Sequence, residues 1–178
     1  MLRQDFREML VAMLVSVTGG VAAGTILAFY TDKLALVPGV FILMPGFLAM
    51  RGSIAASLAA RISAALHLHR KAAEHERSYF GRQNVHASFL LAIITSLILG
   101  LVAYIGTKLI FGIDAPAILL IALIAAFISN LLVIPITFGT TIWLFKHGYD
   151  PDNIMGPYST MVGDIVSIIS LLAAILIV

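Results

Sequence analysis

The chain has 178 residues, of which 61% are hydrophobic and only 11% are charged. A soluble domain usually has about 45–50% apolar and about 25% charged residues, so this composition excludes an ordinary soluble domain and predicts an integral membrane protein. The formal net charge of +2 comes from basic residues beside hydrophobic stretches. These are interpreted as topology signals and not as a nucleic-acid surface. The absence of cysteine excludes disulfides and thiolate chemistry.

Hydrophobic segments long enough to cross a hydrocarbon core of about 30 Å occur along the whole chain. Backbone groups in lipid must be satisfied within a helix or a closed barrel, so we predict an all-α integral membrane protein with five transmembrane helices. Residues 1–178 are interpreted as one domain. Pro38, Pro45, Gly46 and Gly52 predict a break in the second helix. The spans are predicted at about residues 9–30, 34–66, 86–111, 116–145 and 155–178.

Lysines and arginines are shared unevenly between the two sets of predicted loops. Arg3 and Arg7 precede the first span, and more basic residues lie in or beside the connection between the second and third spans. Lys33 and Lys108 stand alone in the loops of the opposite side. Short cytoplasmic loops are rich in Lys and Arg, so the N-terminus is predicted in the cytoplasm and the C-terminus outside the cell membrane. The basic residues of that connection are Arg61, Arg70, Lys71, Arg77 and Arg82.

Asp164 is an acidic residue well inside the fifth predicted span. An ionised carboxylate at such a depth costs about 2.5–3.5 kcal/mol or more, so it usually faces a partner, a cavity or an ion path. Thr160 and Ser167 share its helix face, and Gly163 lets a backbone approach. These oxygen donors favour a hydrated Mg²⁺ or another hard cation. The structural alternative is that Asp164 pairs with Arg51 or bonds to a neighbouring helix.

Asn130 lies beside Ser129 in the middle of the fourth span, ahead of Pro135. A proline removes one helical hydrogen bond and frees a carbonyl, so polar groups here are candidates to line a pore. An equally good interpretation is a kinked helix in which Asn130 bonds to a neighbouring helix. The candidate pore-lining residues are Asn130, Ser159, Gly163 and Ser167.

Asp150, Asp152 and Asn153 precede the fifth span and resemble part of a calcium loop. The glycine and the distal glutamate of such a loop are missing. Capping of the fifth helix by Asp152 or Asn153, with Pro157 in its first turn, is the simpler interpretation. Asp150 and Asp152 remain candidates for a weak cation entrance.

A segment rich in histidine and glutamate follows the second span. Its loose spacing and charged surroundings favour a solvated cytoplasmic loop over a metal cluster. Fingerprints of hydrolases, zinc proteases and nucleotide-binding loops do not occur in the sequence, so no enzyme activity is predicted. The residues of this segment are His67, His69, Glu74, His75 and Glu76.

Two stretches, in the second and fifth spans, carry a recognisable pattern. The second span contains Pro45-Gly46, Arg51-Gly52-Ser53, Ala56-Ser57 and Arg61-Ile62-Ser63. The fifth contains Asp150-Pro151, Gly156-Pro157, Ser159-Thr160 and Asp164. The chain thereby resembles the transmembrane domain of the MgtE magnesium transporters and of the related eukaryotic solute-carrier magnesium transporters.

The resemblance implies transport of a divalent cation, above all Mg²⁺, through a pore between the two subunits of a homodimer. It implies that both copies of Asp164 face one hydrated Mg²⁺ and that the carbonyl of Thr160 helps to hold its water shell. Two rival hypotheses remain. One is an exchanger of the same fold that couples the cation to Na⁺ or H⁺, and the other is a non-transporting scaffold or partner subunit.

The chain departs from the bacterial family pattern in two ways. Met50-Arg51-Gly52-Ser53 takes the place of a bacterial stretch rich in asparagine, which leaves open whether the pore is a channel or an exchanger. About eight residues precede the first predicted span. Gating by large cytoplasmic N-terminal and CBS domains, as in bacterial members, is therefore not expected.

Overall fold

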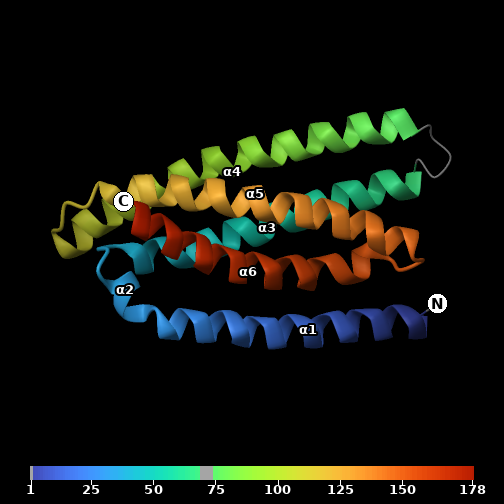
Figure 1. Cartoon of the computed structure of the whole chain (residues 1–178), viewed down its shortest axis with the longest axis horizontal. Helices are drawn as coiled ribbons and strands as arrows, with labels where there is room; N and C mark the ends of the chain where they lie inside the picture. Colours follow the sequence, from blue (N-terminus) through green and yellow to red (C-terminus); the bar gives the residue numbers. More distant parts are fainter. Residues whose placement is uncertain (1, 69–73) are drawn as a thin grey trace.

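The computed structural model describes residues 2–68 and 74–178, and none of these residues lies in a strand. Five of the helices are long and apolar enough to cross a membrane. The predicted all-α membrane fold with five spans is therefore confirmed (Figure 1). The helices are α1 (Leu2–Phe29), α2 (Thr31–Ala35), α3 (Val40–Leu68), α4 (Glu74–Phe111), α5 (Ala117–Lys146) and α6 (Pro151–Ile177).

The break in the predicted second span lies at Pro38 and Gly39, between the short α2 and the long α3. Gly39 has a φ of 83°, a left-handed conformation that glycine adopts without steric cost. The helix α3 then runs without interruption through Pro45 and Gly52. A proline removes only one helical hydrogen bond, and the neighbouring turns are sufficient to continue the helix here.

The last helix starts earlier than the hydrophobic pattern predicts, at Pro151 and not near Met155. Its N-cap is Asp150, whose carboxylate accepts a hydrogen bond from the backbone N–H of Asp152 at 3.0 Å. The predicted cap at Asp152 or Asn153 is therefore wrong, because Asp150 followed by proline is the stronger start signal. Asp164 consequently lies thirteen residues from either end of α6, at its midpoint.

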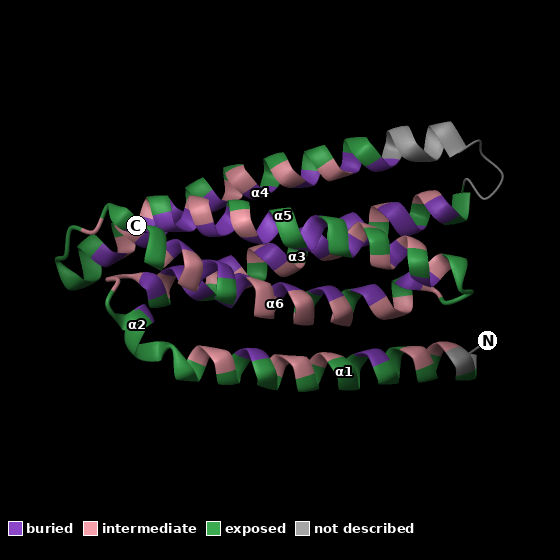
Figure 2. Ribbon diagram, in the orientation of Figure 1, coloured by how far each residue is buried: buried purple, intermediate pink, exposed green. Residues whose placement is uncertain are grey.

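The core lies among α3, α5 and α6, while α1 and α4 lie on opposite sides of these helices (Figure 1). Buried residues concentrate in the three central helices (Figure 2). Phe47, Ile121 and Leu171, one from each central helix, belong to the largest hydrophobic cluster and are almost completely buried. The outer helices expose large apolar side chains such as Val17 and Leu101, as expected of surfaces that contact lipid.

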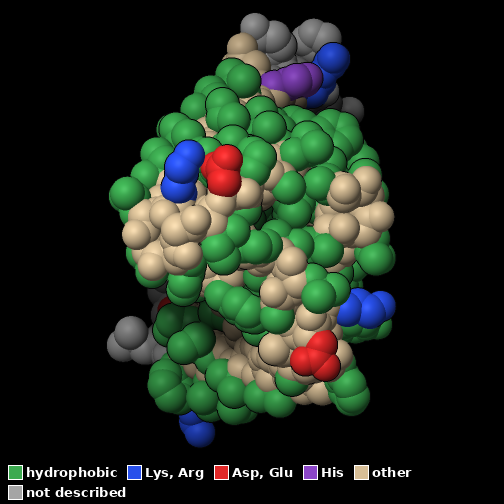
Figure 3. Space-filling view, turned by 90° about the vertical axis from the view of Figure 1, so that its left-hand side faces the viewer, with side chains coloured by type: hydrophobic (Ala, Val, Ile, Leu, Met, Phe, Trp, Pro, Cys, Tyr) green, Lys and Arg blue, Asp and Glu red, His purple; other side chains and the backbone are tan. Residues whose placement is uncertain are grey.

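The N- and C-termini lie at opposite ends of the bundle (Figure 1). The end that holds the C-terminus is largely hydrophobic, with few charged side chains (Figure 3). Here the Tyr104 hydroxyl donates a hydrogen bond to Asp114 at 2.7 Å, and the Lys108 ammonium lies 3.3 Å from the same carboxylate oxygen. These two neighbours hold the pKa of Asp114 below its ordinary value.

Candidate functional site

The carboxylate of Asp164 is half-buried at the midpoint of α6. Among the described residues it forms no hydrogen bond and no ion pair. The helix geometry places it about 20 Å from each end of α6. A charged group at that depth is stable only with water, a polar partner or a cation beside it.

A polar face of α6 leads from the end of the bundle to this carboxylate. Asp152, Gly156, Thr160 and Asp164 follow one another at every fourth position, and the first three are exposed. The hydroxyls of Ser159 and Thr160 both donate to the carbonyl of Gly156, each at 3.1 Å. We call Asp152, Gly156, Thr160 and Asp164 the polar face of α6.

The helix α3 lies beside this polar face. A Cβ atom built on Gly52 would lie 4.0 Å from the Thr160 hydroxyl oxygen. Between Phe41 and Leu68, along a helix described in full, no large hydrophobic side chain is exposed. The exposed positions in that stretch include five small residues, which permit another helix to approach closely. They are Ala49, Ser53, Ser57, Ala60 and Ala64, and are called the small face of α3.

Three of the predicted pore-lining residues lie together on a neighbouring, buried face of α6. Ser159, Gly163 and Ser167 occupy successive fourth positions and are buried. Within residues 2–68 and 74–178, the Ser167 hydroxyl has no hydrogen-bond partner, and a Cβ atom on Gly163 would meet no atom within 4 Å. This face therefore offers an unpaired polar atom and room for a Cβ atom at Gly163, and its role in lining a pore stays a prediction.

Arg51 is almost completely buried, with 1% of its surface exposed, and its contacts differ from the predicted alternative of a pair with Asp164. Its guanidinium donates to the amide oxygen of Asn130 and, at 3.1 Å, to the carbonyl of Ser129. Asn130 in turn donates to the Ala126 carbonyl at 2.7 Å. Asn130 thus joins α3 to α5, as the interhelical interpretation expects, and its pore-lining role stays a prediction.

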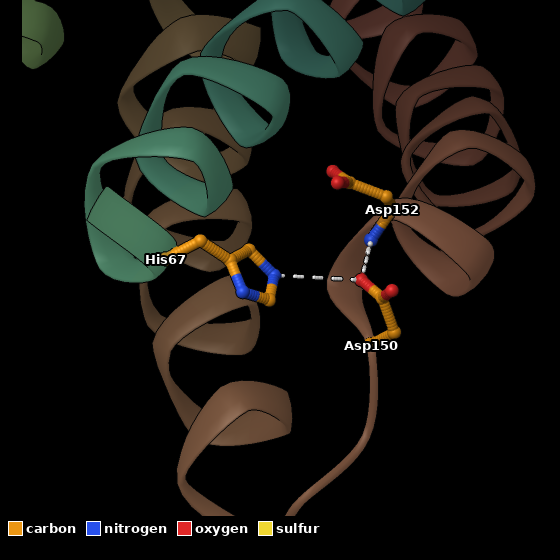
Figure 4. A group of neighbouring side chains, drawn as sticks. All are labelled: His67, Asp150 and Asp152. Carbon is orange, nitrogen blue, oxygen red and sulfur yellow. Dashed lines mark hydrogen bonds and ion pairs between the residues drawn. The ribbon is translucent and has the colours of Figure 1, made fainter. Parts of the chain in front are cut away.

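Three side chains that can bind metal ions meet at the end of the polar face of α6 that is farthest from Asp164 (Figure 4). One potential ligand atom of each of His67, Asp150 and Asp152 lies within 4.8 Å of the others. The His67 Nε2 atom is 3.7 Å from an oxygen of Asp150. The sequence pattern grouped His67 with histidines and glutamates near it in the chain, and missed aspartates that only folding brings close. His69 and the side chains of Glu74, His75 and Glu76 lie outside the described residues.

Residues 44–174 match the model of the MgtE family, whose members are described as divalent cation transporters. The chain is also similar to solute carrier family 41 member 2 from Homo sapiens (28% identity over 174 residues), Mus musculus (27% over 174) and Gallus gallus (29% over 172). Each of these alignments covers 90% of this chain and 29% of the relative, so the chain spans less than a third of the relatives' length. No solved structure matches the chain.

The family match includes the helices that hold the polar and small faces. It extends over most of α3, all of α4 and α5, and α6 as far as Ala174. The resemblance noted in the motifs of the second and fifth spans is thereby confirmed. Because the matched residues make up more than half of the chain, this protein belongs to the MgtE family of divalent cation transporters.

Proposed function

We propose that this chain carries a divalent cation across the membrane, with Mg²⁺ as the favoured ion and Asp164 as its central ligand. The observation that carries this proposal is the half-buried carboxylate at the midpoint of a spanning helix, with no partner among the described residues. The groups near it along α6 are oxygen donors, which suit a hard cation. Binding a cation would offset the cost of holding an ionised group at that depth.

The polar face of α6 supports a route for the ion. Asp150 and Asp152 would collect cations at the end of the bundle, and the ion would pass Gly156 and Thr160 before it reaches Asp164. Mg²⁺ keeps several of its water molecules when protein carboxylates bind it. The backbone carbonyl of Thr160, one turn before Asp164, would accept hydrogen bonds from that water shell.

A second copy of the chain would complete the site. Gly52, next to Ser53 of the small face of α3, lies beside Thr160, and the small face lacks the large apolar side chains that the outer helices present to lipid. In a homodimer formed through this surface, two Asp164 carboxylates would face one ion between the subunits. The resemblance to the family supports the same arrangement, and the small residues permit the close approach that it needs.

The basic residues support an orientation in the cell membrane. Arg3, Arg7 and Lys146 lie toward the end of the bundle where α6 begins, whereas Lys33 and Lys108 lie toward the other end. The positive-inside rule then places the N-terminus and the Asp150–Asp152 entrance on the cytoplasmic side, and the C-terminus outside.

Uptake of Mg²⁺ into proteoliposomes tests the proposal, with wild type compared with Asp164→Asn. The expected result is uptake by wild type that falls to the level of empty liposomes in Asp164→Asn. Asp32→Asn is the matched control, since Asp32 is an exposed carboxylate of α2 at the other end of the bundle. Equal uptake by wild type and Asp164→Asn would exclude Asp164 as the ion ligand.

The two rival functions give different results in the same assay. Coupled exchange requires that Mg²⁺ uptake follow an imposed Na⁺ or proton gradient, whereas a channel responds only to the electrochemical gradient of Mg²⁺. A scaffold without transport activity would show no uptake in wild type, and Asp164→Asn would alter assembly in size-exclusion chromatography. The same purified proteins serve for all of these measurements.

A further inference from the structure

We propose that His67, Asp150 and Asp152 form a binding site for a divalent transition-metal ion that links the end of α3 to the start of α6. The inference deepens the proposed function, because it adds an imidazole ligand and a class of metal ion to the suggested entrance. The three residues come from segments far apart in the chain and surround a common space (Figure 4).

The spacing of the ligand atoms is close to that of an assembled metal site. Bonds from nitrogen or oxygen to a transition metal are about 2.0–2.2 Å long, so ligands on opposite sides of an ion are about 4.0–4.4 Å apart. One ligand atom from each of the three residues lies within 4.8 Å of the others. These separations reach slightly more than the distance of about 4.0–4.4 Å across a bound ion.

Local contacts already hold two of the three ligands in place. Asp150 is fixed as the N-cap of α6, with its Oδ1 atom accepting from the Asp152 backbone at 3.0 Å. The His67 ring packs edge to face against Phe145, with 5.1 Å between ring centroids. The Asp152 carboxylate and the Oδ2 atom of Asp150 have no partner among the described residues. Lone pairs are therefore available on groups that are largely preorganised.

A second observation concerns a buried hydroxyl one helical turn from His67. Ser63 lies one turn before His67 on α3 and is fully buried, and its hydroxyl has no partner in the part of the chain that the structure describes. Ala59, one further turn away, packs in a cluster with Met155, so this side of α3 faces α6. Helical side chains lean toward the N-terminus, which places the His67 ring over the turn of Ser63. A water molecule or a hydrated ion at the inner side of the cluster would satisfy that hydroxyl.

The ligand types select the metal. Mg²⁺ and Ca²⁺ take oxygen ligands, whereas imidazole suits ions such as Co²⁺, Ni²⁺ and Zn²⁺. One imidazole with two carboxylates therefore favours a first-row transition metal over Mg²⁺. Because Asp152 is also the first residue of the polar face of α6, such an ion would occupy the entrance of the proposed route.

Titration of the purified full chain in detergent with Co²⁺ tests the site, followed by visible absorption and calorimetry. We expect one Co²⁺ bound per chain through a nitrogen ligand, and at least about tenfold weaker binding in His67→Ala and in Asp152→Asn. The matched control is His147→Ala, an exposed histidine at the same end of the bundle whose ring nitrogen lies 2.8 Å from the Trp143 carbonyl. It should bind Co²⁺ as wild type does.

The inference is overturned if wild type binds no Co²⁺, if His67→Ala binds it as tightly as wild type, or if His147→Ala loses as much affinity as His67→Ala. These outcomes are separate from a failure of the proposed function, which is read from Mg²⁺ uptake by wild type and Asp164→Asn. If Mg²⁺ uptake depends on Asp164 but Co²⁺ binding does not depend on His67, the metal site is excluded and the proposed transport function stands. Circular dichroism of each variant confirms that the exposed substitutions leave the helices intact.

Discussion

Replacing Asn130 with alanine is expected to destabilise the bundle more than replacing Arg51 with methionine, although the two residues share one hydrogen bond. Arg51 donates to Asn130 and to the carbonyl of Ser129, and its Nε atom has no partner among the residues described. In Asn130→Ala, a buried guanidinium therefore keeps a single acceptor. In Arg51→Met, the charge itself is removed, and a flexible apolar chain that reaches as far as the Nε position of arginine fills part of its place.

The magnitudes follow from the asymmetry between buried charges and buried amides. A hydrogen bond to a charged group contributes about 1.5–3 kcal/mol, so Asn130→Ala should cost about 3 kcal/mol with the lost packing included. Arg51→Met leaves one amide oxygen unpaired, at about 1–3 kcal/mol, but also removes the desolvation cost of a buried charge, which is several kcal/mol. The net loss in Arg51→Met should be about 1 kcal/mol or less.

Equilibrium unfolding in mixed detergent micelles measures these free energies, with Asn130→Asp as the control that keeps an acceptor for Arg51. Asn130→Asp should be milder than Asn130→Ala. The double variant Arg51→Met/Asn130→Ala should be more stable than Asn130→Ala alone, because it no longer buries a poorly solvated charge. Losses that simply add, or an Arg51→Met variant less stable than Asn130→Ala, would refute this reasoning.

Two further predictions concern the outer parts of the bundle. A Cβ atom on Gly19 would overlap the Met161 side chain, so Gly19→Ala should cost about 1–3 kcal/mol. A Cβ atom on Gly20 would meet no described atom within 4 Å, so Gly20→Ala should not destabilise the protein. Equal midpoints of thermal unfolding for the two variants would contradict the α1–α6 contact. Tyr104→Phe removes the hydrogen bond that lowers the pKa of Asp114, so that pKa should rise toward its ordinary value. In wild type, this bond stabilises the folded protein at pH values above the ordinary pKa of an aspartate. The stabilisation is lost as the pH falls through the lowered pKa of Asp114. A carboxyl-carbon NMR titration of Asp114 that is identical in both proteins would contradict this assignment.

Hydrophobic length alone was sufficient to predict the membrane fold, because each span must satisfy its backbone within one helix. It was not sufficient to place the helix ends. The start of α6 depends on a polar cap at Asp150, and the break before α3 depends on Gly39, and neither changes the local hydropathy enough to be seen. A hydropathy pattern reports burial in lipid and does not distinguish an early helical turn from a loop.

The isolated acid at Asp164 was visible in the sequence because a charge inside a span is costly whatever its surroundings. The contacts of Arg51 with Asn130, and of His67 with Asp150, were not visible. Each joins residues on different helices, and the rotation of one helix against another is set by packing across the whole contact. The signal available for Arg51 was its own position in the middle of a span, which requires an acceptor on some neighbouring helix.

Electron paramagnetic resonance of bound Mn²⁺, followed by competition with Mg²⁺, tests most directly whether Asp164 is the ion ligand. The method detects binding of the ion itself, whereas an uptake assay detects only its movement. The measurement compares His67→Ala/Asp152→Asn with the same protein that also carries Asp164→Asn, both in detergent, so that the cluster at the end of the bundle contributes little. We expect Mn²⁺ binding that Mg²⁺ displaces in the first protein, and the loss of that binding in the second. The same binding and the same displacement in both proteins would contradict the assignment of Asp164 as the ion ligand.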